Sequence, residues 1–65
     1  MTPRQKKFIA DQLSNNETDS DQDLIKFLTE ETNLPKELIT AIVTEERPKH
    51  LINPFYKTDF KKYNL

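Results

Sequence analysis

Residues 24–43, which read LIKFLTEETNLPKELITAIV, decide the fold. Apolar residues at 24, 25 and 28, and again at 38, 39, 42 and 43, recur at the spacing of one helix face, so they favour two amphipathic helices. Between them, Asn33 tolerates the left-handed conformation that ends a helix, and Pro35 suits the first position of the next helix. Because the connection is short, the two helices should pack as a hairpin or as a helix-turn-helix corner.

The ends of these two helices are predicted from capping residues and prolines. Ser20 is an N-cap residue, and the acidic residues just after it lie where the helix dipole favours negative charge. The first helix is therefore expected over residues 20–32. The second is expected over residues 35–46, because Pro48 pushes the residue before it out of helical geometry.

A further helix is predicted at the start of the chain, over residues 3–14. Thr2 and Gln5 have the spacing of a capping box, and Pro3 fits the first helical position. The three polar residues at 14–16 favour local side-chain hydrogen bonds and should end the helix. The expected core of the three helices consists of nine apolar residues: Phe8, Ile9, Leu13, Leu24, Leu28, Leu38, Ile39, Ile42 and Val43.

The fold class is thus all-α, with a three-helix domain over residues 1–46 and a tail over residues 47–65. The tail is interrupted by prolines, carries five Lys or Arg against one Asp, and contains four of the six aromatic residues. A chain of about 60 residues buries only about 60% of its unfolded surface, so it needs every large apolar side chain. We therefore expect the tail to pack on the domain, with Phe55, Phe60 and Tyr63 completing the core.

Composition excludes several classes of function. The 65 residues include no Gly, no Cys and one His, His50, which leaves no disulfide, no thiolate nucleophile and no phosphate loop built on glycine. His50 has no evident catalytic partner and is expected at the surface or at a helix end. No apolar run reaches the roughly 18 residues of a membrane span, and no signal-peptide stretch follows Met1. We expect a soluble cytoplasmic protein that is not an enzyme, has no cofactor or metal, and does not contact a membrane.

One acidic stretch has the carboxylate spacing of a calcium-binding EF-hand loop. Asp19, Asp21 and Asp23 alternate, and Glu30 lies at the twelfth position counted from Asp19. The sixth position of such a loop needs Gly for its sharp turn, and here it is Leu24. The stretch therefore favours an acidic, capped start of a helix.

Over Ile25 to Thr44, the chain resembles the DNA-binding helix-turn-helix motif. Leu28, Ile39 and Ile42 fall at apolar core positions of the motif, and Asn33 falls where its turn usually has Gly. The resemblance implies that the second helix would read DNA. However, residues 14–33 carry six Asp or Glu against one Lys, and a surface that faces phosphates usually needs net positive charge. Nucleic-acid binding would then depend on the basic residues at both ends of the chain: Arg4, Lys6, Lys7, Arg47, Lys49, Lys61 and Lys62.

The preferred functional prediction is a small protein-binding module or regulatory accessory protein, an adaptor or an inhibitor, from a bacterium or phage. Its partner would be another protein or a second copy in a homodimer, and a nucleic-acid-binding regulator is the alternative. The candidate surfaces are the acidic face over residues 17–31 and the segment over residues 51–63. The candidate partner-binding residues on them are Asp21, Glu30, Glu31, Ile52, Phe55, Tyr56 and Lys57.

Overall fold

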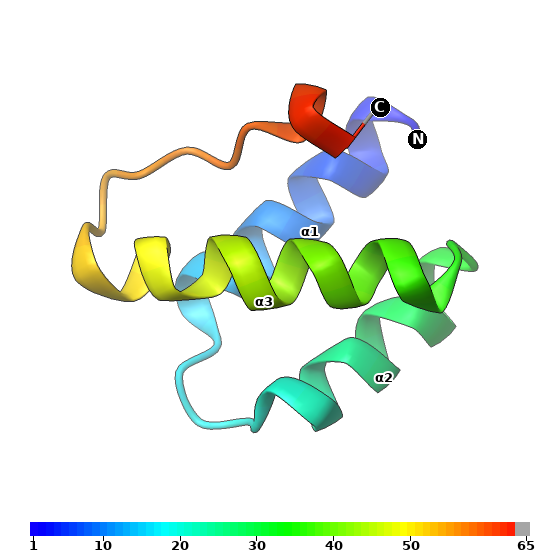
Figure 1. Ribbon diagram of the computed structural model, residues 1–65, viewed down its shortest axis with the longest axis horizontal. Coiled ribbons are helices and arrows are strands. Elements are labelled where there is room, and N and C mark those ends of the chain that lie inside the picture. The colour runs from blue at the N-terminus through cyan, green and yellow to red at the C-terminus, as the bar shows by residue number, and fades with distance from the viewer. Residues whose placement is uncertain (64–65) are drawn as a thin grey trace.

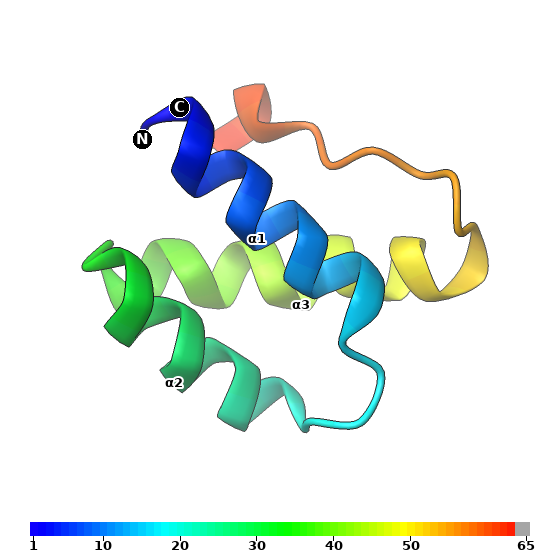
Figure 2. The same cartoon turned by 180° about the vertical axis from the view of Figure 1, so that it is seen from behind.

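Three α-helices form most of residues 1–63, the part of the chain that this computed structural model describes. Figure 1 shows α3 running across the molecule, and Figure 2, from behind, shows α1 and α2 packed on the same side of it. The tail then turns back alongside α3 and ends in a short 3₁₀ helix. The predicted all-α, three-helix fold is confirmed. The elements are α1 (Pro3–Asn15), α2 (Asp21–Thr32), α3 (Lys36–Ile52) and η1 (Phe60–Tyr63).

The starts of α1 and α2 follow from local hydrogen bonds, as the sequence predicts. The Thr2 hydroxyl accepts from the Gln5 amide at 3.1 Å, and the Gln5 side chain accepts from the Thr2 amide at 2.9 Å, which completes the capping box of α1. The Ser20 hydroxyl accepts from the Asp23 amide at 3.1 Å and caps α2. Asn33 ends α2 in the left-handed conformation, with φ of 57°. Each of these predictions is confirmed.

The predicted end of α3 is wrong. The helix does not stop at residue 46 but continues to Ile52, with Pro48 inside it. Proline costs the helix one backbone hydrogen bond, because its nitrogen has no proton to donate to the carbonyl of residue 44. The turns around it are held by tertiary contacts, since Glu46, Arg47 and His50 are all buried. Packing of these three side chains therefore overrides the local preference of Pro48.

The core matches the expected one closely. Seven of the nine predicted residues are fully buried, while Phe8 and Leu38 are partly buried at its edge. Phe60 and Tyr63 pack against the core, as expected. Phe55 does not, because 88% of its surface is exposed, so its expected place in the core is wrong. Across residues 1–63, none of the helices combines the length and the apolar character needed to cross a membrane.

Candidate protein-interaction surface

The tail is attached to α3 through one buried carboxylate. Glu46 is fully buried, and it accepts a hydrogen bond from the Tyr56 hydroxyl at 2.6 Å. The Tyr63 hydroxyl lies 3.2 Å from Glu46 and 2.8 Å from the neighbouring carboxylate of Glu45, so the two carboxylates share its single proton. The ammonium groups of Lys62, at 3.0 Å, and Lys49, at 3.3 Å, form ion pairs with Glu46. The backbone amide of Asp59 donates to it at 3.3 Å. We call this arrangement the Glu46 cluster, and it satisfies a buried charge that would otherwise be costly.

The Glu46 cluster changes the acidity of its members. Burial by itself raises the pKa of Glu46, but the hydrogen bonds from Tyr56, Lys62, Lys49 and the Asp59 amide outweigh it and lower the pKa from 4.5 to about 2. The hydrogen bond to Glu46 raises the pKa of the Tyr56 hydroxyl. Glu46 is therefore a charged anchor for the tail at neutral pH.

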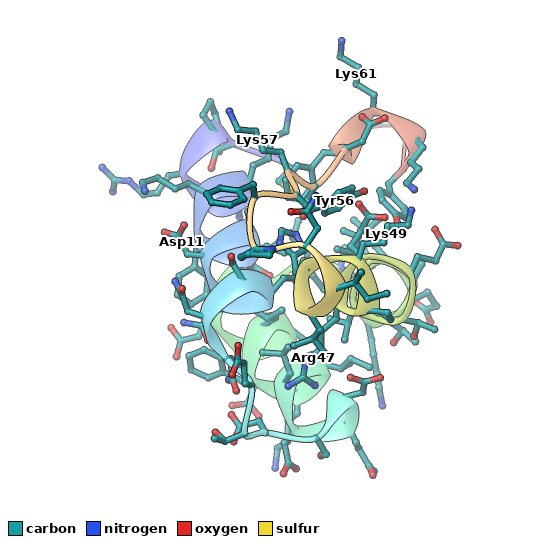
Figure 3. All side chains as sticks on the ribbon, turned by 90° about the vertical axis from the view of Figure 1, so that its left-hand side faces the viewer. Asp11, Arg47, Lys49, Tyr56, Lys57 and Lys61 are labelled. Atoms are coloured by element: carbon teal, nitrogen blue, oxygen red, sulfur yellow. The ribbon has the colours of Figure 1, made fainter. Side chains whose placement is uncertain are left out.

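The neighbouring residue holds a different segment. Arg47 is 5% exposed, and its guanidinium pairs with the Asp21 carboxylate at 2.7 Å. It also donates to the backbone carbonyl of Asn16 at 3.0 Å and to that of Asp19. Arg47 thus fixes the connection between α1 and α2. Figure 3 shows it on the side of α3 opposite to Tyr56.

His50 supports the tail from the last turn of α3. The sequence predicts His50 at the surface or at a helix end. It lies at the end of α3 and is buried. Its Nε2 lies 2.6 Å from the Thr58 hydroxyl, and its ring meets the Tyr56 ring edge-on, with 5.0 Å between centroids. Burial lowers the pKa of His50, although the Glu46 charge opposes the shift. His50 is therefore neutral at pH 7 and packs the tail onto α3.

Next to these anchored residues, three large apolar side chains face outward. Leu51 is 54% exposed, Ile52 is 84% exposed and Phe55 is 88% exposed. They lie at the end of α3 and in the turn that follows it, and we call them the apolar patch. Two hydrogen bonds hold the turn: the Asn53 side chain accepts from the Phe55 amide, and the Asn53 carbonyl accepts from the Tyr56 amide, each at 3.0 Å.

The predicted partner-binding residues separate into two groups. Ile52 and Phe55 belong to the apolar patch, Lys57 is exposed just beyond it, and Tyr56 lies behind it with its hydroxyl on Glu46. The acidic residues Asp21, Glu30 and Glu31 are exposed on α2, away from the patch. Asp21 is also engaged by Arg47.

The basic residues proposed for nucleic acid do not share one free surface. Arg47 is buried, and Lys49 and Lys62 are paired with Glu46. Lys7 pairs with Asp11 at 3.4 Å, on α1. The remaining members, which include Arg4 and Lys6 on α1 and Lys61 on η1, belong to separate elements, and Figure 3 shows Lys61 extending away from the body.

The Glu46 cluster and Leu51 were missed at the level of sequence, although a signal for the cluster exists. Residues 39, 42, 43, 46, 47 and 50 continue one helical face, so the periodicity runs through Pro48. Because the helix was expected to end at 46, the polar members of that face were not assigned to the interior. No group of three or more His, Cys, Asp or Glu side chains that could hold a metal ion occurs within residues 1–63.

Comparison of the chain with protein-family models, with curated proteins and with solved structures gives no match.

Proposed function

We propose that this chain is a small non-enzymatic protein-binding module, an adaptor or inhibitor of the cytoplasm, which docks on another protein through the apolar patch. The observation that carries the proposal is the exposure of Leu51, Ile52 and Phe55 within five positions of the chain, while the described residues 1–63 bury seven apolar side chains fully. Contiguous exposed apolar side chains on a small domain mark an interaction site, whereas scattered ones do not.

The way in which the patch is held supports the same proposal. The turn after α3 is fixed by the two hydrogen bonds to Asn53, and Tyr56 ties it to Glu46. A side chain presented from a rigid backbone loses little conformational entropy on binding, so more of its burial contributes to affinity. Phe55 is thus placed as the anchor of the patch, in the way that aromatic residues dominate many interfaces.

The nucleic-acid alternative has less support. Phosphate binding depends on several lysines or arginines that can contact one backbone together. Four of the seven candidates are engaged in ion pairs within the fold, namely Lys7, Arg47, Lys49 and Lys62. We therefore keep protein binding as the proposal.

The experiment that tests the proposal is site-specific photo-crosslinking in the cells that make the protein. A photoreactive phenylalanine analogue at position 55 should give one discrete protein adduct, and the same analogue at position 26, on α2, should not. The adduct is identified by mass spectrometry, and the purified partner is then titrated with the wild-type chain and with Phe55→Ser.

We expect Phe55→Ser to weaken binding at least about tenfold, as for the loss of a central aromatic anchor. Because Phe55 is 88% exposed, the free energy of unfolding of the variant should lie within about 0.5 kcal/mol of the wild-type value. Equal affinity of the two proteins for the partner would refute the proposal.

A further inference from the structure

The charges around the apolar patch restrict the chemistry of its partner. Residues 47–58 contain Arg47, Lys49 and Lys57 and no Asp or Glu. Arg47 is buried on the other side of α3, so Lys49 and Lys57 are the cations next to the patch. On α3, Glu46 is fully buried and already compensated, while Glu45 is exposed and accepts from the Tyr63 hydroxyl at 2.8 Å. Asp59 is exposed two residues after Lys57, and its carboxylate accepts from the Lys61 amide. Among residues 47–59, the exposed cations Lys49 and Lys57 therefore outnumber the single exposed carboxylate, Asp59.

The two lysines are held in different ways. Lys49 lies over the Tyr56 ring, with its Nζ 5.7 Å from the centroid, and pairs with Glu46 at 3.3 Å, which fixes it beside the patch. Its side chain is still 45% exposed. Lys57 is exposed, and it takes part in none of the ion pairs among residues 1–63. Its charge is thus available to a partner.

From this arrangement, and given the proposed function, we infer that the apolar patch binds an acidic protein surface, in which an apolar pocket for Phe55 is bordered by carboxylates. Complementary charge at the border of an interface accelerates association and rejects partners of the wrong sign. The apolar side chains supply most of the affinity, and Lys57 and Lys49 make the patch prefer acidic partners.

Two other occupants fit the charges less well. In a symmetric dimer, the patch would meet its own copy, which brings the like charges Lys57 and Lys49 of both chains towards one another. Protein segments that bind anionic membranes carry roughly four to eight Lys or Arg. Residues 47–58 carry three, one of them the buried Arg47, and α2 opposes such binding with Asp23, Glu30 and Glu31 exposed.

The test uses a random-peptide phage library selected on the immobilised full chain, followed by titration of the selected peptides. Three variants are compared with the wild type: Phe55→Ser, Lys57→Glu, and Lys26→Glu as the matched control. Lys26 is exposed on α2, so Lys26→Glu makes the same change in net charge away from the patch. Circular dichroism establishes that each variant is folded.

We expect the selected peptides to place Asp or Glu beside a large apolar residue. Phe55→Ser should weaken their binding at least about tenfold. Lys57→Glu should weaken it about three- to tenfold, because attraction at the border becomes repulsion, and Lys26→Glu should leave it unchanged. Raising the salt concentration should weaken binding to the wild type and not to Lys57→Glu.

Other outcomes overturn the inference, and they separate it from the proposed function. Peptides that need Phe55 but lack acidic residues, or that bind Lys57→Glu as well as the wild type, leave patch docking intact and refute the acidic partner. Peptides that bind Phe55→Ser unchanged count against both. Binding to vesicles of phosphatidylcholine and phosphatidylglycerol that is lost in Phe55→Ser identifies a membrane instead. A dimer in sedimentation equilibrium that Phe55→Ser dissociates identifies a second copy.

Discussion

Glu46 shows how one residue can couple the stability of this protein to pH. Its carboxylate is ionised in the folded state down to a pKa of about 2, against an ordinary value of 4.5. The folded state therefore binds this proton more weakly than the unfolded state does. The stabilisation from Glu46 is complete above about pH 4.5 and is lost as the pH falls towards 2.

We predict that Glu46→Gln removes most of this pH dependence. The variant keeps the volume and one acceptor oxygen but not the charge, so it should be less stable than the wild type near neutral pH and closer to it near pH 2. The free energy of unfolding, measured in urea between those limits, checks the prediction. Glu30→Gln, at an exposed position on α2, is the control. Its free energy of unfolding should still fall on acidification, because Glu46 remains. The prediction would be contradicted if the free energy of unfolding of Glu46→Gln and of the wild type changed with pH in the same way.

At the scale of the secondary-structure elements, a helix boundary could be predicted from the sequence where contacts between residues close in the chain determine it. The starts of α1 and α2 were predictable, because the capping bonds of Thr2 and Ser20 join residues three apart in the chain. The end of α3 was not, because contacts distant in the chain decide it: the Asp59 amide reaches Glu46 across 13 positions, and Arg47 reaches the Asn16 carbonyl across 31. The helix-breaking preference of proline is known from the local sequence, but contacts made by a later segment can override it.

Pro48 gives the prediction that belongs to this scale. Pro48→Ala restores a backbone donor inside α3, so we expect the free energy of unfolding to rise by about 1–2 kcal/mol, which is less than the full cost of an interior proline because alanine leaves the unfolded chain freer. Pro54→Ala, in the exposed turn after α3, gains no helical hydrogen bond and should lower the same quantity by a few tenths. Urea unfolding of both variants decides the matter. A destabilised Pro48→Ala would show that the proline fits α3 better than the lost bond suggests.

At the scale of the whole molecule, the small core leaves little margin. Ile42 is fully buried in a cluster of seven residues. Ile42→Val should cost about 0.5–1.5 kcal/mol and leave a folded protein, whereas Ile42→Ala should cost about 2–5 kcal/mol. Because a domain of this size has only a few kcal/mol of stability, we expect Ile42→Ala to be largely unfolded at 37 °C. Thermal unfolding followed by circular dichroism checks both. A cooperative transition well above that temperature for Ile42→Ala would show a larger reserve of stability.

The candidate surface was predictable only in part. Ile52 and Phe55 were singled out because the tail concentrates aromatic and apolar residues, and the structure exposes both. Leu51 was not, because its exposure depends on the last turn of α3, which was not expected to exist. The expectation that Phe55 joins the core failed for a related reason: Phe60 and Tyr63 already cover the core from the tail, and the turn at Asn53 directs Phe55 outward.

Glu46 and Arg47 are consecutive in the chain, yet one anchors the tail and the other the connection between α1 and α2. Successive residues of a helix point about 100° apart. Because these two anchors are adjacent in the chain, this angle sets the directions from which the two segments approach α3. Inserting a single residue between them would rotate everything that follows by one such step. The tail or the interhelix connection could then be attached, but not both in their present positions, so a change in length at this junction should destabilise the fold.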